Sequence, residues 1–303
     1  MSKKNFILII ILIALAASAY IYQGPFKNWQ QQKEVPKNFL AKVDINKVNK
    51  IEITKNGGTV TLVASVYRWK VENTKDFYVS DTAANSLISK LKEAVKDQLE
   101  IVSQNKDKKS DFSTDASGIA VKLKQDNQEL ANFIVGKTAS DYLGTYISQE
   151  NSDKTYLTKV DLASVFFQDD WRDKTIFASD KTKINKIRIQ SAGKEFIIVK
   201  EGENWIATGT KAVKLNNDKV TSLADLLSSL VASEIPEQKF DSTGLEKNNL
   251  IIQATGDGID NTLIIGNDNG KGMYYVKTGA SDNIYLITKT ERDNLNKQIK
   301  DLQ

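Results

Sequence analysis

The sequence predicts an α+β protein of two tandem homologous domains, each an antiparallel meander, a helix, a second meander and a closing helix, behind an N-terminal transmembrane helix. Three observations predict this fold. A long segment is repeated, apolar residues alternate with polar ones on both sides of a helical stretch in each copy, and an apolar run follows two lysines at the N-terminus. A repeat this long is typical of a duplicated domain and not of a solenoid of short units.

The repeat keeps a constant spacing over its first half. VNKIEI beginning at Val48 returns as INKIRI beginning at Ile184, and Trp69 returns as Trp205, so both pairs lie 136 positions apart (48 to 184 and 69 to 205). The helix-like NSLISKLKEAV returns at the same spacing as TSLADLLSSLV. The register shifts after a loop that is longer in the first copy, and the later matches are Phe112 with Phe240, Gly136 with Gly266, Tyr146 with Tyr275, and Tyr156 with Tyr285.

The repeat divides the chain into five predicted segments. Two of them are the copies themselves, and the others are the N-terminal segment, a spacer that holds two of the three prolines, and a connection between the copies. Their predicted ranges are 1–22 for the transmembrane signal anchor, 23–42 for the juxtamembrane spacer, 43–168 for the first repeat, 169–182 for the connection and 183–303 for the second repeat.

In the first copy, period-two alternation predicts a hairpin. Ile51 and Ile53 lie on one side of Asn56-Gly57-Gly58, and Val60 and Leu62 lie on the other, which is the combination of alternation and turn residues that hairpins require. Alternation at Trp69 and Val71 predicts a third strand. Ser80 or Asp81 then begins a predicted helix with one apolar stripe, made of Leu87, Ile88, Leu91 and Val95.

The second half of the first copy begins with Lys106, Lys108 and Lys109 among acidic and polar residues, which we interpret as a solvated loop. Thr158-x-x-Asp161 resembles a capping box that opens a helix. Between them we expect four short strands, at 119–123, 132–135, 145–147 and 155–157.

The second copy is expected to follow the same course. A helix is predicted from about Asn217 to Leu230, and Thr288-x-x-Glu291 opens the last helix. Its predicted strands lie near Ile187, Ile197, Trp205, Ile251, Leu263, Tyr275 and Tyr285.

The N-terminus has the pattern of an export signal or a signal anchor. Lys3 and Lys4 precede an almost unbroken apolar run over 6–22, close to the lower limit of about 17 residues for a helix that spans a bilayer. Tyr20, Tyr22 and Trp29 suit a membrane interface and favour an uncleaved anchor. Cleavage after Ala19 and a buried core helix are the alternatives. Either export reading places the body outside the cytoplasm, and the favoured uncleaved anchor predicts a single-pass protein of a bacterial cytoplasmic membrane.

The amino-acid composition excludes several kinds of binding and catalytic site. The chain has 42 basic and 38 acidic residues, a net charge of +4 that is too small to predict nucleic-acid binding, which requires a concentrated basic face. It has no cysteine and no histidine, so disulfides, Ser-His-Asp and Cys-His catalysis and the usual zinc sites are excluded. We expect no cofactor and no metal.

Several motifs resemble sites but are better explained as turns. Ser103-x-x-Lys106, Lys277-Thr278-Gly279 and Ser281-Asp282-Asn283 are the three strings of serine β-lactamases, but here their order and spacing are wrong. The stretches 256–261 and 267–270 are rich in oxygen ligands but lack the alternating acids and distal Glu of a calcium loop. Asp, Asn and Gly are also what hairpin turns require.

Six residues remain as interaction candidates, and two as core residues. Asp169, Asp170, Trp171 and Arg172 in the connection form an ion network around a packed Trp or a cation or ligand site, and Tyr146 and Tyr275 recur at matching hairpins, where they serve sheet packing or protein contact. Trp69 and Trp205 share a strand face with Val71 and Ala207, which favours a core position over a sugar-stacking one.

The hairpin with a following Trp, the helix, the strand that ends in Gly, the Tyr-containing hairpin and the junction WRDKTIF resemble the family called domain of unknown function 4340, over almost all of 43–303. The resemblance implies a membrane-anchored bacterial envelope protein. Such proteins are often encoded beside ABC-type transporter genes of the gliding-motility kind, so the resemblance implies an accessory subunit as well. It carries over no catalytic or binding residue.

Three classes of function follow. The first is a non-catalytic accessory or scaffold protein beside an ABC-type transporter, since two tethered copies can bind bivalently without new chemistry. The second is a protein that binds an envelope polymer or a small ligand in a cleft between the repeats. The third and least favoured is a hydrolase or lyase that uses carboxylates alone. An exposed apolar or Tyr-rich patch would favour the first.

Overall fold

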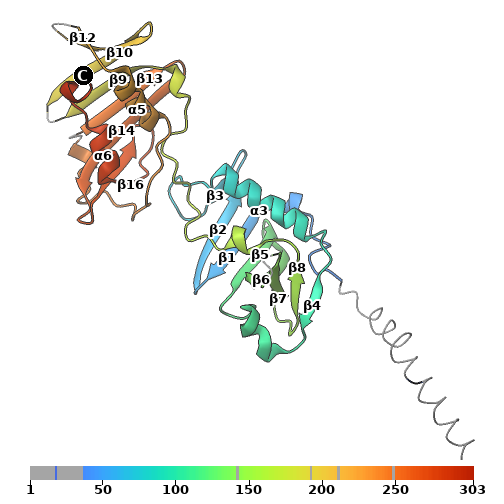
Figure 1. Ribbon diagram of the computed structural model, residues 1–303. Helices are drawn as coiled ribbons and strands as arrows, with labels where there is room; N and C mark the ends of the chain where they lie inside the picture. The colour runs from blue at the N-terminus through green and yellow to red at the C-terminus, as the bar shows by residue number, and fades with distance from the viewer. Residues whose placement is uncertain (1–17, 19–36, 141–142, 192, 210–211, 248–249) are drawn as a thin grey trace, which may run out of the picture. The chain divides into compact units, whose positions relative to one another are not determined.

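The computed structural model describes residue 18 and residues 37–140, 143–191, 193–209, 212–247 and 250–303. Apart from residue 18, the predicted anchor at 6–22 lies outside this part of the chain, as does most of the predicted spacer. Within it, no helix has both the length and the apolar character needed to cross a membrane. The chain forms two compact units (Figure 1). One takes in the described residues up to Arg68 together with Asp81–Asp170, and the other comprises Trp69–Ser80 and Trp171–Gln303.

The predicted α+β class is confirmed: the structure is mostly antiparallel sheet with a few helices. The first sheet has eight strands in the order β3-β2-β1-β5-β6-β7-β8-β4. These strands are β1 (Lys50–Lys55), β2 (Gly58–Ala64), β3 (Trp69–Val71), β4 (Glu100–Ser103), β5 (Ile119–Gln125), β6 (Gln128–Thr138), β7 (Thr145–Gln149) and β8 (Thr155–Thr158).

Strand β1 joins the two predicted meanders of this sheet, because it pairs with β2 on one side and with β5 on the other. Ile51 lies opposite both Leu62 and Leu123, so apolar side chains of three strands meet on one face. The predicted β1–β2 turn is confirmed: Asn56 and Gly57 have φ of 51° and 79°, as a two-residue hairpin turn requires.

The predicted first helix is confirmed as α3 (Asp81–Ala94), which buries Leu87 and Leu91. The helix predicted after Thr158 is only the short α4 (Ala163–Phe166), and its capping box is wrong. The Thr158 hydroxyl donates to Asp97 at 2.6 Å and accepts from the Val160 N–H, so it does not cap α4.

The Lys-rich segment is not a loop. It forms the 3₁₀ helix η2 (Lys106–Phe112), which follows strand β4, and Lys109 is only 9% exposed. The Lys109 ammonium group donates to the carbonyl of Ser152 at 2.8 Å. A lysine can be buried in this way because its long stem packs against apolar groups while its ammonium group finds an acceptor.

The second unit repeats the design, with strand order β12-β11-β10-β9-β13-β14-β15-β16. Here β9 is the joining strand, paired with both β10 and β13. The strands are β9 (Ile184–Ser191), β10 (Lys194–Glu201), β11 (Asn204–Thr208), β12 (Val213–Lys214), β13 (Leu250–Gly256), β14 (Ile259–Asp268), β15 (Met273–Thr278) and β16 (Tyr285–Thr288).

Two helices of the second unit, α5 (Asn217–Ser228) and α6 (Lys289–Leu295), lie against one face of its sheet (Figure 1). Both begin where the sequence predicts. Asn216 caps α5 by accepting from the N–H groups of Asp218 and Lys219, and the predicted Thr288–Glu291 capping box is present.

The core of the second unit includes a residue from far earlier in the chain. Phe77 is 1% exposed and packs edge-on against Tyr285, with ring centroids 5.7 Å apart. The Arg172 guanidinium group lies 5.4 Å from the centroid of the Phe77 ring, and the Asp173 N–H donates to the Tyr78 carbonyl at 2.7 Å. The segment Trp69–Ser80, which follows β2 in sequence, therefore completes this core.

The two tryptophans are not equivalent, which corrects the expectation of two core positions. Trp205 is 5% exposed and belongs to the second core, whereas Trp69 is only half-buried. The outer neighbour of the strand does not explain the difference, because β11 pairs with β12 through Ile206 and Lys214, and β3 has the matching bridge from Lys70 to Tyr78. The main chain is nevertheless the same at both sites, because each carbonyl accepts the N–H ten positions later, from Val79 and Leu215.

We predict that Trp205→Ala lowers the free energy of unfolding by about 3–5 kcal/mol, as expected for a buried aromatic residue. Trp69→Ala is the matched variant, and because Trp69 is half-buried we expect a clearly smaller loss. Urea unfolding followed by circular dichroism would measure both. Equal losses would contradict the difference in burial.

Phe77→Ala should also destabilise the second unit, by about 3–5 kcal/mol, because it empties a site in its core. Tyr67→Ala is the control, since this nearby aromatic side chain is 94% exposed and we expect a change within about 0.5 kcal/mol. Hydrogen exchange of amides in β9 and β13 would report the second unit directly. Unchanged protection there in Phe77→Ala would show that Phe77 does not support this core.

Candidate interaction sites

The predicted cluster in the connection is divided between the two units. Asp169 belongs to the first unit, where its almost fully exposed carboxylate pairs with the Lys55 ammonium group at 3.1 Å. Asp170 is half-buried in the same unit. Trp171 belongs to the second unit, where it is 6% exposed and so has a structural position.

Arg172 has a structural role in the second unit, where it donates to the carbonyl of Ile235 at 3.1 Å and stacks on Phe77. Asp173 accepts from the Thr175 N–H at 3.0 Å. Over the described residues, no three acidic side chains gather in a way that could hold a metal ion.

The two tyrosines predicted as contact residues are both half-buried. Tyr146 packs edge-on against Phe112, with ring centroids 4.8 Å apart. This contact brings η2 onto the sheet at β7, which fits the packing role that the repeat suggested. Tyr275 lies on β15, at the position that matches Tyr146.

The motifs interpreted as turns are turns only in part: Lys277-Thr278 end strand β15 and Ser281-Asp282-Asn283 lie between β15 and β16, whereas Ser103 ends strand β4 and Lys106 begins η2. Lys277 pairs with Asp282 across the β15–β16 turn at 2.8 Å. Ser103 accepts from the Asn105 N–H at 3.2 Å at the end of β4. Gly258 and Gly270 have φ of 69° and 81°, which glycine adopts freely.

The sequence pattern did not single out the most exposed apolar residues of the described chain. Val66 is 84% exposed and Tyr67 is 94% exposed, both in the turn between β2 and β3. The turn is fixed at its base, where the Ser65 N–H donates to the Arg68 carbonyl at 2.8 Å and the Arg68 guanidinium group binds the Asp81 carboxylate at 3.2 Å. A comparison of the two copies could have found it, because 136 positions later the chain has Gly202 and Glu203.

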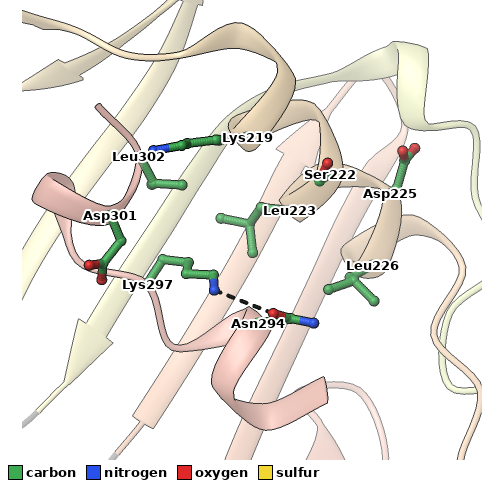
Figure 2. A pocket seen from close by; sticks show the side chains of 9 residues that line it. All are labelled: Lys219, Ser222, Leu223, Asp225, Leu226, Asn294, Lys297, Asp301 and Leu302. Atoms are coloured by element: carbon green, nitrogen blue, oxygen red, sulfur yellow. Dashed lines mark hydrogen bonds between the residues drawn. The ribbon is translucent and has the colours of Figure 1, made fainter. Parts of the chain in front are cut away.

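A groove lies between α5 and α6 in the second unit (Figure 2). It has a volume of about 540 Å³, with Leu223, Leu226 and Leu302 among its lining residues. Two lysines at its rim have partners: Lys219 donates to the main-chain oxygen of Gln303 at 2.6 Å, and Lys297 donates to Asn294 at 3.4 Å. Its lining is thus partly apolar and its rim carries both charge signs, since Asp225 and Asp301 complete it.

The pKa values shift in ways that fit structural roles. Burial lowers the pKa of the Lys109 ammonium group, and the carboxylates of Asp153 and Asp115 act in the opposite direction. The hydroxyl and N–H of Ser117 donate to Asp115 at 2.6 and 3.1 Å, and these bonds lower the pKa of Asp115. None of these groups lines the groove between α5 and α6.

The fold defines the class of this protein: it is an α+β protein of two units, each built on an eight-stranded antiparallel sheet. The model of one protein family, described as "Domain of unknown function (DUF4340)", matches residues 69–247 and 205–303. The chain belongs to this family, as the sequence resemblance predicted. No curated protein and no solved structure matches the chain.

The bonds to Asp115 predict a pH effect. Because its pKa in the folded state is lowered, the carboxylate stabilises the fold above the unfolded-state pKa of about 4, and this contribution is lost as the pH falls through the lower folded-state value. Asp115→Asn should therefore melt at a lower temperature than wild type at pH 7. The difference should shrink steadily as the pH falls below about 4. A difference independent of pH would contradict the role of the charge.

Proposed function

We propose that the chain is an accessory protein without catalytic activity, anchored by residues 6–22 in the cytoplasmic membrane of a bacterium, with its two units outside the cytoplasm. Its partner is a membrane protein complex, and the family resemblance favours an ABC-type transporter. The observation that carries the proposal is the exposure of Val66 and Tyr67 on a turn with a fixed base.

This turn supports a contact function because its apolar side chains, Val66 and Tyr67, are almost fully exposed and bury little surface in the fold. A buried aromatic side chain contributes to stability, whereas Tyr67 leaves 94% of its surface in water. The matching turn in the second unit is formed by Gly202 and Glu203, between the paired residues Glu201 and Asn204. The fold therefore accepts a polar turn at this place. Exposed tyrosines are frequent among the residues that dominate protein–protein binding energies.

The α5–α6 groove supports the alternative, a protein that binds an envelope polymer or a small ligand. Its volume of about 540 Å³ is within the usual range of ligand sites, and its partly apolar lining with a charged rim would suit an amphipathic ligand. Its two lysines are, however, already bonded to groups of the chain itself. For this reason the exposed turn carries the main proposal.

The test uses the full-length protein in the bacterial cells that produce it, with a photo-crosslinking amino acid in place of Tyr67. Glu203 is the matched control position, because it lies in the corresponding turn of the second copy. We expect position 67 to yield at least about tenfold more crosslinked transporter subunit than position 203. The crosslink should disappear in a variant that lacks residues 1–22.

Recovery of envelope polymer or lipid alone at position 67, with no membrane protein, would overturn the accessory role. Equal yields at positions 67 and 203 would show that the Val66–Tyr67 turn is not the contact. Mass spectrometry of the crosslinked peptides identifies the partner in each case.

A further inference from the structure

A pocket in the first unit lies between the end of strand β6 and the short helix α4. Its volume is about 520 Å³, which is within the usual range of ligand sites. Of the six described residues that line it, four are polar, and the other two supply an aromatic ring and a methyl group. They are Lys137 and Thr138 of β6, Asp161, Ala163 and Ser164 at the start of α4, and Phe167 directly after it.

Hydrogen bonds within the first unit hold the start of α4 in place. The Thr145 hydroxyl of β7 accepts the N–H groups of Leu162 and Ala163 at 2.9 and 3.2 Å, so it satisfies two main-chain donors that the first turn of a helix leaves free. Asp161 accepts the Ser164 N–H at 3.1 Å, which orients its carboxylate. The polar side of the pocket is therefore ordered before any ligand binds.

Phe167 is exposed, although the residues just before it belong to the core. Val165 and Phe166 are 6% and 0% exposed, whereas Phe167 is 43% exposed. Its N–H donates to the Ala163 carbonyl at 3.0 Å, so its main chain still belongs to the end of the helix. The ring thus adds little to the core and offers an apolar surface beside the polar groups of the pocket.

A lysine restrains the Phe167 ring. The Lys55 ammonium group lies 5.8 Å from the ring centroid and also pairs with the Asp169 carboxylate at 3.1 Å. Such a cation–π contact is weak at an exposed site, but it favours one orientation of the ring. A ring that is already oriented loses less freedom when a ligand stacks on it, which favours binding.

The lining suits a neutral ligand that carries many hydroxyl groups. The Lys137 ammonium group only donates hydrogen bonds, and the Asp161 carboxylate only accepts them, while the two hydroxyl side chains do both. An acyl chain would leave these groups without partners, and a cation or an anion would meet a charge of its own sign. A sugar hydroxyl donates and accepts, so it can bond to every one of them.

We propose that this pocket binds a saccharide, with the Phe167 ring against the apolar C–H face of one sugar and the polar side chains bonded to its hydroxyl groups. The inference goes beyond the proposed function and takes from it only the location outside the cytoplasm, where envelope glycans are within reach. A glycan of the envelope and a free oligosaccharide share this chemistry, so the experiment includes both.

The test measures binding of the full-length protein, in a detergent without sugar head groups, to two kinds of saccharide. Insoluble cell-wall sacculi from the same bacterium are tested by co-sedimentation, and soluble trisaccharides of glucose and of N-acetylglucosamine are tested by hydrogen exchange. We expect at least one kind to bind, and a bound trisaccharide to slow the exchange of amides in 163–167. Binding to sacculi alone identifies the polymer as the source, and binding of trisaccharides alone identifies a free oligosaccharide.

Substitutions at the pocket should weaken this binding. Phe167→Ala removes the stacking surface and should weaken it at least about tenfold, whereas Phe167→Trp keeps an aromatic ring and should stay within about threefold of wild type. Asp161→Asn replaces one acceptor oxygen by a donor, and we expect a loss of at least about threefold. Tyr67→Ala is the matched control, because this exposed aromatic residue of the first unit does not line the pocket.

The same exchange experiment checks that the variants fold. Because Phe167 and Asp161 are not core residues, each variant should keep the amide protection of β5 and β6. If Phe167→Ala loses that protection, Asp161→Asn decides the test. Equal binding by the wild type and the folded pocket variants would overturn the inference, and so would an equal loss in Tyr67→Ala or the absence of binding to every saccharide probe.

The remaining outcomes separate this inference from the proposed function. A photo-crosslink from position 167 to a protein, with no saccharide bound, would show a protein contact and refute the saccharide site. Crosslinks to a transporter subunit at position 67 that persist in Phe167→Ala would support the accessory role whatever the saccharide result. Saccharide binding that depends on Phe167, with no membrane protein crosslinked at position 67, would refute the accessory role and support the saccharide site.

Discussion

Each unit depends on the pairing of one central strand on both of its sides. β1 pairs with β2 and β5, and β9 pairs with β10 and β13, so two meanders that are separated in sequence by a helix become one sheet. Ile51 and Ile187 stand in these strands with 0% exposure, and each lies between apolar neighbours. The helix that connects the two meanders must carry the chain from one edge of the sheet to its other half. It therefore crosses a face of the sheet.

A second constraint is the close approach of main chain at the repeated glycines. A Cβ atom at Gly136 would overlap the carbonyl of Phe112, and one at Gly266 would overlap the carbonyl of Thr243. In both units the segment before the second meander thus crosses β6 or β14 at a distance that only glycine allows. The IVG sequence of the first copy and the matching IIG of the second are explained by this close packing and do not indicate a binding site.

Local chemistry explains what could be predicted from the sequence. Alternation around Asn56-Gly57 gave the first hairpin, and Thr288 with Glu291 gave the start of α6, because each signal is contained in a few adjacent residues. The errors concern long-range partners. Lys109 can be buried because the Ser152 carbonyl accepts a hydrogen bond from its ammonium group. The Thr158 hydroxyl donates to the Asp97 carboxylate, 61 positions earlier, and does not cap a helix. Neither partner is visible in the local pattern. The joining of the meanders by β1 and β5 was missed for the same reason.

The difference between the copies at the β2–β3 turn supports a contact in the first unit. There the turn carries Val66 and Tyr67, which are 84% and 94% exposed, while the corresponding turn of the second unit consists of Gly202 and Glu203. The fold therefore does not require apolar side chains at this place. The proposed protein contact accounts for their exposure, whereas a ligand site in the α5–α6 groove does not.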